Sequence, residues 1–397
     1  MVYMHYFFVL GTNPALSVAE LTSVVNLKNL KLLSADFLIA ESELEINVER
    51  LIGRLGGIIK IGRILVDINE NNPLQIEDEV KNIAILKQAR NPEGKFNFGL
   101  SDYGQHGFNK KDIGLKLKKY FSEAEISSRF VISREKTLSS VVITQNKLVK
   151  KGIEIILAAE EKHTYIGETL AVQLFKDLSL RDYGRPARDD LSGMLPPKLA
   201  QIMINLAQIS GENSAIVDPF CGSGTILSEA LLMGYKHLFG SDISLKAIED
   251  TRKNISWTKE LYKTDNFKLK LLVKDAAYLS KFIKADSVEA VITEPFLGPQ
   301  RGLINFNQII PNLEGLYSEA IREFLKILKK GGRVVMVWPL FYGQRPISPN
   351  YSGFRMINMI PKELESNKFI KKNSRETIVY GRPGQKVYRE IVVLEKI

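Results

Sequence analysis

The stretch that decides the fold is DPFCGSGT, which runs from Asp218 to Thr225. An apolar run at 214–217 precedes it and predicts a strand, while 225–233 has the apolar spacing of a helix. Glycines at 222 and 224 let a ligand approach the backbone closely, because they carry no Cβ atom. A strand, a glycine-rich turn and a helix in this order are typical of one unit of a Rossmann-like α/β domain.

The chain around this turn alternates between strands and helices. We expect further strands at 237–241, 269–273, 288–293 and 333–338, and helices at 197–207, 245–257 and 316–328. This alternation predicts a parallel, doubly wound sheet with ligands at the carboxyl ends of its strands. The last segment reads as a β-hairpin, with strands at 376–380 and 388–395 and a turn at 381–384. We therefore expect the sheet of this domain, residues 196–397, to end antiparallel.

Three segments precede this domain. Residues 1–70 alternate short strands and helices, which predicts a small α+β domain of ferredoxin-like type. Residues 71–165 form a second unit, with predicted helices at 76–88 and 110–121, a strand at 95–100 and a strand pair at 129–133 and 140–144. The irregular residues 166–195 are rich in arginine, aspartate, glycine and proline, and we expect them to be a linker.

The charge of the chain favours a polyanionic partner. The net charge is +10 and the calculated pI about 9.3. Residues 109–151 hold eleven lysines and arginines against four acidic residues, which gives +7 (11 − 4) in this segment. A solvated, lysine-rich surface is the alternative explanation of this segment when it is taken alone.

Several classes of protein are disfavoured by composition. We find no apolar stretch long enough to cross a bilayer and no signal-peptide pattern. The single cysteine, Cys221, rules out a disulfide framework, so we expect a cytoplasmic protein. The four histidines stand far apart in the chain and show no metal-ligand spacing, so we predict no metal.

Acidic residues at the ends of predicted strands indicate the kind of ligand. Leu227 stands where a dinucleotide fingerprint requires a small residue, and no Lys-Ser or Lys-Thr follows to bind a nucleoside triphosphate. Asp218 ends the first strand of the domain and suits a cationic ligand. S-adenosylmethionine, with its α-ammonium and sulfonium groups, is such a ligand. The alternative for Asp218 is that it only caps the helix that follows.

Two further acids follow the next two strands. Asp242 can accept both hydroxyls of a ribose. Asp275 can accept the adenine amino group, although a solvated turn acid is the alternative. The candidate residues for binding S-adenosylmethionine are Asp218, Phe220, Gly222, Gly224, Thr225, Asp242, Ile243, Asp275 and Ala276.

With these motifs the sequence resembles the THUMP-domain tRNA guanosine N2-methyltransferases, which are class I S-adenosylmethionine-dependent enzymes. The resemblance rests on the octet that begins at Asp218, on Ser241-Asp242 and on the stretch 193–200. Segments 8–11 and 16–21 resemble the opening domain of that family, and 98–101 with the basic helix resembles its THUMP module. The octet alone is shared with other DNA and RNA amino-methyltransferases. The resemblance implies that the N-terminal half binds tRNA, near its 3′ end, and presents a base to the C-terminal domain.

The family carries an acid or amide, two prolines and an aromatic residue after the fourth strand. Here the corresponding residues are Glu294, Pro295, Phe296 and Leu297, so the acid is longer and the aromatic residue is shifted by one position. A side-chain oxygen and a backbone carbonyl that accept the two N–H bonds of an exocyclic amine direct its lone pair towards a methyl donor. Proline fixes the backbone, and an aromatic ring stacks on an extruded base. We expect Glu294, Pro295 and Phe296 to be catalytic; a strand-ending acid beside a core phenylalanine is the alternative.

The leading prediction is therefore methylation of tRNA on an exocyclic base amine, at guanine N2, with position 10 implied by the resemblance. The tRNA is expected to contact the basic segment 109–151 and the catalytic face. Two alternatives stay open at this point: an adenine N6-methyltransferase of RNA or DNA, and a tRNA-binding protein that keeps the cofactor without catalysis. The lack of a helix-turn-helix or zinc-finger pattern argues against DNA. The motifs leave the product, mono- or dimethylated, and the oligomeric state open.

Overall fold

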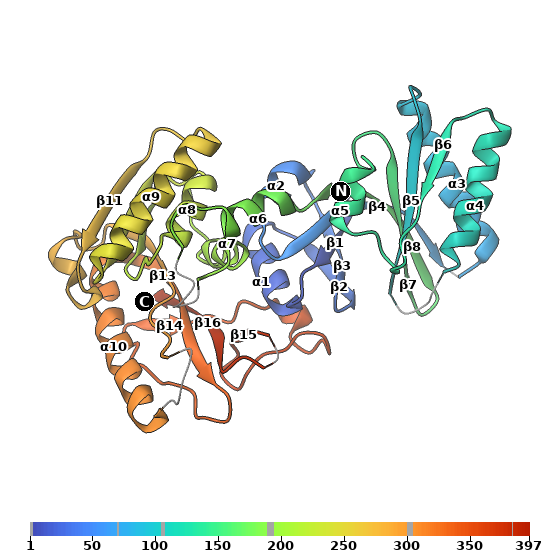
Figure 1. The fold of residues 1–397 in the computed structure, drawn as a ribbon. Helices are drawn as coiled ribbons and strands as arrows, with labels where there is room; N and C mark the ends of the chain where they lie inside the picture. Colours follow the sequence, from blue (N-terminus) through green and yellow to red (C-terminus); the bar gives the residue numbers. More distant parts are fainter. Residues whose placement is uncertain (1–2, 70, 105–107, 189–193, 300–304, 383) are drawn as a thin grey trace.

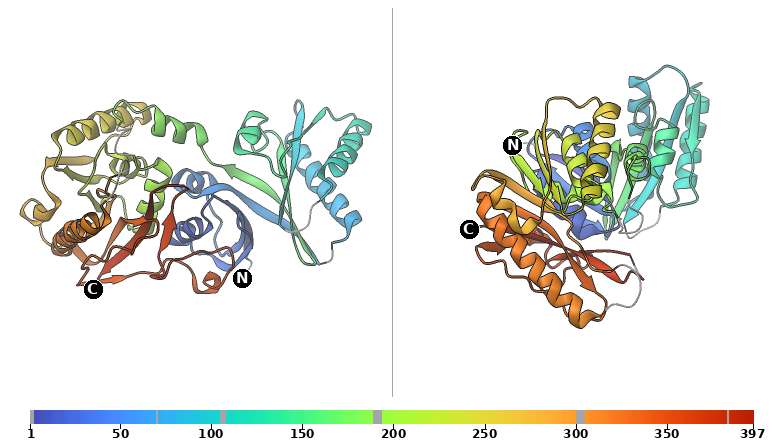
Figure 2. Two further views of the ribbon diagram at one scale, coloured as in Figure 1. Left: turned by 60° about the horizontal axis from the view of Figure 1, so that its bottom comes forward. Right: turned by 60° about the vertical axis from the view of Figure 1, so that its left-hand side comes forward.

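The computed structural model describes residues 3–69, 71–104, 108–188, 194–299, 305–382 and 384–397. Residues 189–193 of the predicted linker and Pro383 of the predicted turn lie outside these ranges. The chain forms three bodies in a row (Figure 1): an N-terminal unit (3–69) in the middle, a second unit (71–172) at one end and a C-terminal unit (194–397) at the other. The two further views in Figure 2 show the same order. Within the described residues, no helix is long and apolar enough to cross a membrane.

One eight-stranded sheet runs through the N-terminal and second units, in the order β2-β3-β1-β4-β8-β7-β5-β6. Its strands are β1 (Met4–Leu10), β2 (Lys28–Ser34), β3 (Phe37–Ser42), β4 (Ile58–Asn69), β5 (Phe96–Gly104), β6 (Ser128–Val131), β7 (Ile153–Glu160) and β8 (His163–Val172). The long antiparallel pair of β4 and β8 joins the strands of the two units. The predicted boundaries at 70 and 165 therefore fall at the end of β4 and inside β8.

The helices of this half are α1 (Pro14–Val24), α2 (Val48–Arg54), α3 (Pro73–Arg90), α4 (Lys110–Glu123), α5 (Ser140–Gln145) and α6 (Phe175–Tyr183). The prediction of a strand at 140–144 is wrong, because these residues form α5, and β6 pairs in parallel with β5 instead. Local β-propensity misled the prediction. The Ser139 hydroxyl caps the helix by accepting a hydrogen bond of 3.3 Å from the Val142 backbone N–H. Ile143 is buried against Leu138 and Leu148, so tertiary packing outweighs propensity.

The C-terminal unit contains the predicted parallel sheet. Its strands are β9 (Ala215–Asp218), β10 (His237–Asp242), β11 (Lys268–Val273), β12 (Val288–Thr293), β13 (Leu328–Phe341), β14 (Phe354–Met356), β15 (Ile378–Tyr380) and β16 (Val387–Lys396). The order is β11-β10-β9-β12-β13-β16-β14, with β15 also on β16. β11, β10, β9, β12 and β13 pair in parallel and the pairs of β16 are antiparallel, as predicted. The direction of chain progression reverses between β9 and β12, where ligand sites form in such sheets.

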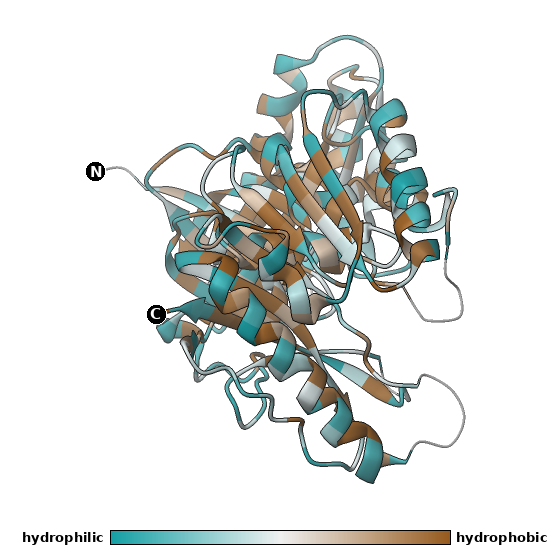
Figure 3. Cartoon of the chain, turned by 90° about the vertical axis from the view of Figure 1, so that its left-hand side faces the viewer, coloured by the Kyte–Doolittle hydropathy of each residue, from teal (hydrophilic) through white to brown (hydrophobic). Residues whose placement is uncertain are grey.

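Helices cover this sheet: α7 (Pro197–Leu206), α8 (Thr225–Leu232), α9 (Leu245–Tyr262) and α10 (Phe306–Ile327), with short 3-10 turns η1 (Ala276–Lys281) and η2 (Lys362–Leu364). Figure 3 shows hydrophobic residues gathered on the strands and a mixture of hydrophilic and hydrophobic residues on the helices. This distribution is expected when each helix turns one apolar stripe towards the sheet. The predicted helix at 316–328 is longer than expected and begins at Phe306.

The N-terminal unit packs directly on the C-terminal unit. The buried carboxylate of Glu20 accepts hydrogen bonds from the backbone N–H groups of Gly56 (2.8 Å) and Gly57 (2.7 Å) and from the Asn205 amide (2.8 Å). A Cβ atom on Gly56 would lie 2.0 Å from the carbonyl oxygen of Lys198. The two units therefore approach each other as closely as backbone sterics allow, and Glu20 satisfies the polar groups of the interface.

In the predicted linker, 166–195, residues 166–172 complete β8 in the first sheet, whereas α6 and Ala187 contact the C-terminal unit. The guanidinium of Arg181 donates to both carboxylate oxygens of the buried Glu229 on α8, at 2.7 and 3.2 Å. Asn254 on α9 both donates to and accepts from the backbone of Ala187, each at 2.9 Å. These contacts order the described part of the segment next to the glycine-rich turn.

Candidate active site

The two glycines of the glycine-rich turn have different surroundings. Both have left-handed backbone angles, with φ of 52° at Gly222 and 81° at Gly224. A Cβ atom on Gly222 would meet nothing within 4 Å, whereas one on Gly224 would lie 2.8 Å from the Thr251 side chain. Gly222 therefore borders open space that a ligand can enter, and Gly224 allows α9 to pack closely on the turn.

Asp218 lies at the end of β9, beneath the turn. Its Oδ1 accepts hydrogen bonds from the Thr293 hydroxyl (2.7 Å) and from the Phe220 backbone N–H (3.3 Å). Burial raises the pKa of Asp218 to about 7; these two donors lower it, and the nearby Asp242 and Glu294 carboxylates raise it further. A carboxyl with this pKa responds to a neighbouring cation by losing its proton.

Asp242 closes the other side of the turn, at the end of β10. Its Oδ2 accepts from the Gly222 backbone N–H (3.1 Å) and its Oδ1 from the Ser244 N–H (2.9 Å). Each oxygen keeps further acceptor capacity, so a fixed carboxylate is available to two hydroxyls. The adjacent Ile243 side chain is 75% exposed and offers an apolar surface beside this carboxylate.

The third acid is close to the second because β10 and β11 are neighbours. The Lys274 backbone N–H donates to the Asp242 carbonyl (2.9 Å), and the exposed Asp275 follows directly. Asp275 Oδ1 caps η1 by accepting from the Ala277 N–H (2.9 Å). The three predicted acids thus stand at the carboxyl ends of three neighbouring strands, β9, β10 and β11.

The remaining predicted cofactor residues are less open. Phe220 is half-buried, and Ala276 is buried. Thr225 is buried as well, and its hydroxyl accepts a hydrogen bond of 2.5 Å from Arg185 Nη1. The Thr225 hydroxyl is thus already hydrogen-bonded to Arg185, which precedes the C-terminal unit in the chain. Burial raises the pKa of the Cys221 thiol, which makes the thiol an inert packing group.

Glu294 follows β12 directly and forms an ion pair that sequence reasoning missed. Its Oε1 accepts from Arg389 Nε at 2.5 Å and its Oε2 from Arg389 Nη2 at 3.4 Å. Arg389 lies on β16, two strands away in the sheet. The longer side chain of glutamate suits this reach across β13. The sequence placed Arg389 in the predicted antiparallel hairpin, but it did not give the register of that strand and therefore did not indicate that Arg389 contacts Glu294.

The other two motif residues have opposite surroundings. Pro295 is buried, whereas Phe296 is 57% exposed. The Phe296 carbonyl accepts a hydrogen bond of 2.9 Å from the Tyr317 hydroxyl on α10. The Tyr317 hydroxyl thereby fixes the backbone of the motif, while the Phe296 ring is exposed to solvent.

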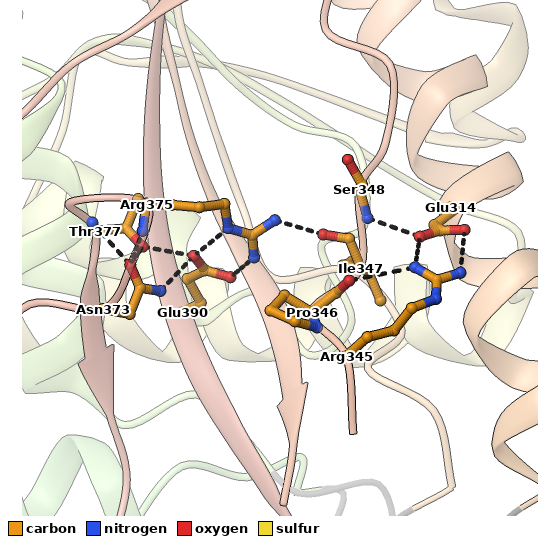
Figure 4. Close-up of polar contacts among 9 residues, drawn as sticks. All are labelled: Glu314, Arg345, Pro346, Ile347, Ser348, Asn373, Arg375, Thr377 and Glu390. Carbon is orange, nitrogen blue, oxygen red and sulfur yellow. Dashed lines mark hydrogen bonds and ion pairs between the residues drawn. The ribbon is translucent and has the colours of Figure 1, made fainter. Parts of the chain in front are cut away.

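A polar cluster fixes the strand that carries Arg389 (Figure 4). The fully buried carboxylate of Glu390 accepts from Arg375 Nε (3.1 Å), the Asn373 amide (2.7 Å) and the Thr377 hydroxyl (2.5 Å). Arg375 also donates to the Ile347 carbonyl at 2.5 Å. Because successive strand residues point to opposite faces, Glu390 anchors β16 on one face while Arg389 reaches Glu294 from the other.

Most of this region is similar to a known family of protein domains. Residues 185–340 match the family model described as "UPF0020: RMKL-like, methyltransferase domain". The match covers the glycine-rich turn, the three acids and the Glu294 motif, but ends before the strand that carries Arg389.

Relatives and a solved structure resemble more of the chain. The tRNA (guanine(10)-N2)-dimethyltransferase of Methanothermobacter thermautotrophicus is 33% identical over 37% of this chain, and that of Methanocaldococcus jannaschii 31% over 40%. These alignments span only 39% and 40% of the relatives' own length. The enzyme of the same name from Pyrococcus abyssi is 24% identical over 92% of this chain and 97% of its own length.

TrmN from Thermus thermophilus has a similar fold over nearly the whole length, with a TM-score of 0.55, 16% identity and coverage of 99% of this chain and 100% of that chain. The predicted fold class is thereby confirmed, with a Rossmann-like methyltransferase sheet after an α+β N-terminal half.

Proposed function

We propose that this chain is an S-adenosylmethionine-dependent tRNA methyltransferase that modifies the exocyclic N2 amine of guanine. The observation that carries the proposal is the meeting of two motifs at one point of the sheet. The residue before Glu294, Thr293, is hydrogen-bonded to Asp218 in the glycine-rich octet. Acceptors for a base amine therefore stand next to a turn that can hold a methyl donor.

The residues around the turn fit the parts of S-adenosylmethionine. Asp242, held by the Gly222 and Ser244 backbone, suits the ribose hydroxyls, and Asp275 suits the adenine amino group. The exposed Ile243 suits one face of the adenine ring. Asp218 balances the positive charge of the aminoacyl end. The cofactor supplies a methyl group on a sulfonium sulfur, and the S–C bond breaks as the C–N bond to the amine forms.

The acceptors at the amine are Glu294 and a backbone carbonyl. Tyr317 already donates to the Phe296 carbonyl, whereas none of the described residues donates a hydrogen bond to the carbonyl of Pro295. We assign the two amine hydrogens to a Glu294 oxygen and the Pro295 carbonyl, and Glu294 takes the proton that the nitrogen releases. The exposed Phe296 ring stacks on the extruded base.

The tRNA is held by the second unit, which we assign as a THUMP domain. The exposed Lys111 and Lys118 are seven residues apart on α4 and so share one face of the helix. Other basic residues of the segment are less free, since Lys116 is paired with Glu77 and Asp112, and Lys110 donates to the carbonyls of Glu135 and Lys136. The similarity to the Pyrococcus abyssi tRNA enzyme over 92% of this chain supports the proposal that one unit binds tRNA and another carries out methyl transfer.

The deciding experiment is methyl transfer from labelled S-adenosylmethionine to unmodified tRNA transcripts, with mass spectrometry of the nucleosides. The proposal expects N2-methylated guanosine, and guanosine 10 is the first position to examine, given the names of the relatives. N6-methyladenosine as the product would replace guanine by adenine in the proposal. Tight binding of cofactor and tRNA without transfer would leave a non-catalytic binding protein.

A further inference from the structure

The ion pair between Glu294 and Arg389 has one edge on which a donor and an acceptor stand side by side. Arg389 Nη2 gives one N–H to Glu294 Oε2 and carries a second N–H, while Oε2 keeps lone pairs. The side chains of Arg389 and Glu294 are 16% and 12% exposed, so the pair is not fully buried. Among the described residues, the Arg389 side chain donates hydrogen bonds to Glu294 alone.

This edge is complementary to the hydrogen-bonding pattern of guanine and not to that of adenine. The Watson–Crick edge of guanine has the O6 acceptor beside the N1–H and N2–H donors. Adenine has an N6–H donor and the N1 acceptor at the corresponding places. An N–H next to a carboxylate oxygen therefore matches guanine twice, whereas adenine would set donor against donor and acceptor against acceptor.

We propose that the Glu294–Arg389 pair reads the Watson–Crick edge of the target base and makes the enzyme specific for guanine. Glu294 Oε2 accepts from N1–H and N2–H, and Arg389 Nη2 donates to O6. This inference rests on the proposed function and deepens it, because it names Arg389 as the specificity-determining residue. The longer Glu294, in place of the Asp or Asn of similar motifs, is what lets the carboxylate meet Arg389 across β13.

The structure holds Arg389 firmly enough for such a role. Its neighbour Glu390 is fully buried and bound by Arg375, Asn373 and Thr377 (Figure 4). Position 389 lies between β13 and β15, paired with Pro339 on one side and Tyr380 on the other. A guanidinium on an internal, anchored strand loses little freedom when a base binds, so its hydrogen bond contributes fully to discrimination.

The test uses tRNA that carries 2-aminopurine in place of the methylated guanosine. This base keeps the 2-amino group but lacks O6 and N1–H. We expect the parent enzyme to prefer guanosine by about 100-fold or more in kcat/KM, because a site built for polar partners rejects an analogue that lacks them. Arg389→Met should lower this preference by about tenfold, the contribution of one charge-assisted hydrogen bond. Arg389→Lys, which keeps one donor, should recover part of the preference.

The matched control is Arg333→Met. Arg333 also pairs with a glutamate of β16, Glu395, at 3.1 Å and with similar exposure (15% and 22%), but at the far end of the strand. This control should retain the full preference for guanosine. Equal losses of kcat/KM on both substrates in Arg389→Met, with an unchanged preference, would make Arg389 a merely structural partner and overturn the inference.

A variant that fails to fold would be recognised by lost binding of S-adenosylhomocysteine, and Arg389→Lys would then decide. Failure of the proposed function looks different, because the parent enzyme itself would then methylate no guanosine in any tRNA.

Discussion

Thr293 donates a hydrogen bond of 2.7 Å to the buried carboxylate of Asp218 and so links the last residue of β12 to the last residue of β9. These strands flank the point where the order of the sheet reverses. Asp218 begins the glycine-rich octet, and Glu294 follows Thr293. In the proposed reaction, this link couples the position of the methyl donor to that of the base amine.

We expect Thr293→Val, which keeps the shape but removes the donor, to raise the pKa of Asp218 from its value of about 7. Cofactor binding at pH 7 should weaken, since a buried acceptor loses a hydrogen bond worth about 0.5–1.5 kcal/mol. Calorimetry with S-adenosylhomocysteine measures the change. Thr258→Val is the control, because Thr258 is equally buried but donates only to the Asn254 carbonyl within its own helix. Equal effects of the two variants would contradict the coupling.

The pKa of Asp218, about 7, predicts a pH dependence of cofactor binding. A cationic ligand favours the ionised carboxyl, so affinity for S-adenosylmethionine should rise about tenfold from pH 6 to pH 8 and binding should release a proton. The stability of the fold without ligand depends on pH in the opposite direction. A raised carboxyl pKa stabilises the fold fully below the unfolded value, 3.8, and this contribution is lost as the pH rises through about 7. Asp218→Asn should remove both dependences, and affinity independent of pH in the parent would refute the assignment.

Glu294 is expected to act as a charged acceptor whose position depends on Arg389. Glu294→Gln keeps one acceptor oxygen but replaces the other with an amide N–H, so it should retain partial activity. Glu294→Ala should lose most of the activity, by about 100-fold or more, while binding S-adenosylhomocysteine as the parent does. Single-turnover methyl transfer to tRNA separates the two variants. Full activity of Glu294→Ala would exclude Glu294 from the reaction.

The free face of α4 is expected to contact phosphate groups. The double variant Lys111→Ser, Lys118→Ser should weaken tRNA binding and flatten its salt dependence. With fewer lysines in contact with phosphates, fewer counterions are released from the tRNA on binding. The control replaces two exposed lysines of the C-terminal unit, Lys253 and Lys268, by serine and changes the net charge by the same amount. Binding titrations at several salt concentrations give the slopes. Indistinguishable slopes for the two double variants would mean that charge at large, and not this face, attracts the tRNA.

The contact between the N-terminal and C-terminal units predicts a sharp contrast between two glycines. Gly56→Ala would place a Cβ atom 2.0 Å from the Lys198 carbonyl oxygen, so we expect a loss of about 1–3 kcal/mol or more in the free energy of unfolding. Gly53→Ala, three residues earlier, meets nothing within 4 Å inside α2 and should be neutral or stabilising. Urea unfolding of both variants tests this. A stable Gly56→Ala protein would mean that the two units can separate slightly at little cost.

Local sequence was enough to determine the C-terminal sheet and the edge at which its site forms. Glycines with positive φ, acids at the ends of strands and the alternation of apolar runs act over a few residues, so the octet from Asp218, Asp242 and Asp275 could be placed without coordinates. Local signals were weaker in short elements. The β-branched run at 140–144 became a helix because Ser139 caps it and Ile143 is buried by residues outside it.

Only the tertiary structure decided which partners the site residues have. Glu294 and Arg389 are separated by 95 residues in the chain, and their contact depends on the register of β13 with β16. The same is true of the link between Thr293 and Asp218, 75 residues apart. The packing of Glu20 between Gly56 and Asn205 is equally non-local. Such contacts depend on how strands and domains pack as a whole, because the interactions that align them are distributed over many buried side chains and none is visible in a single segment.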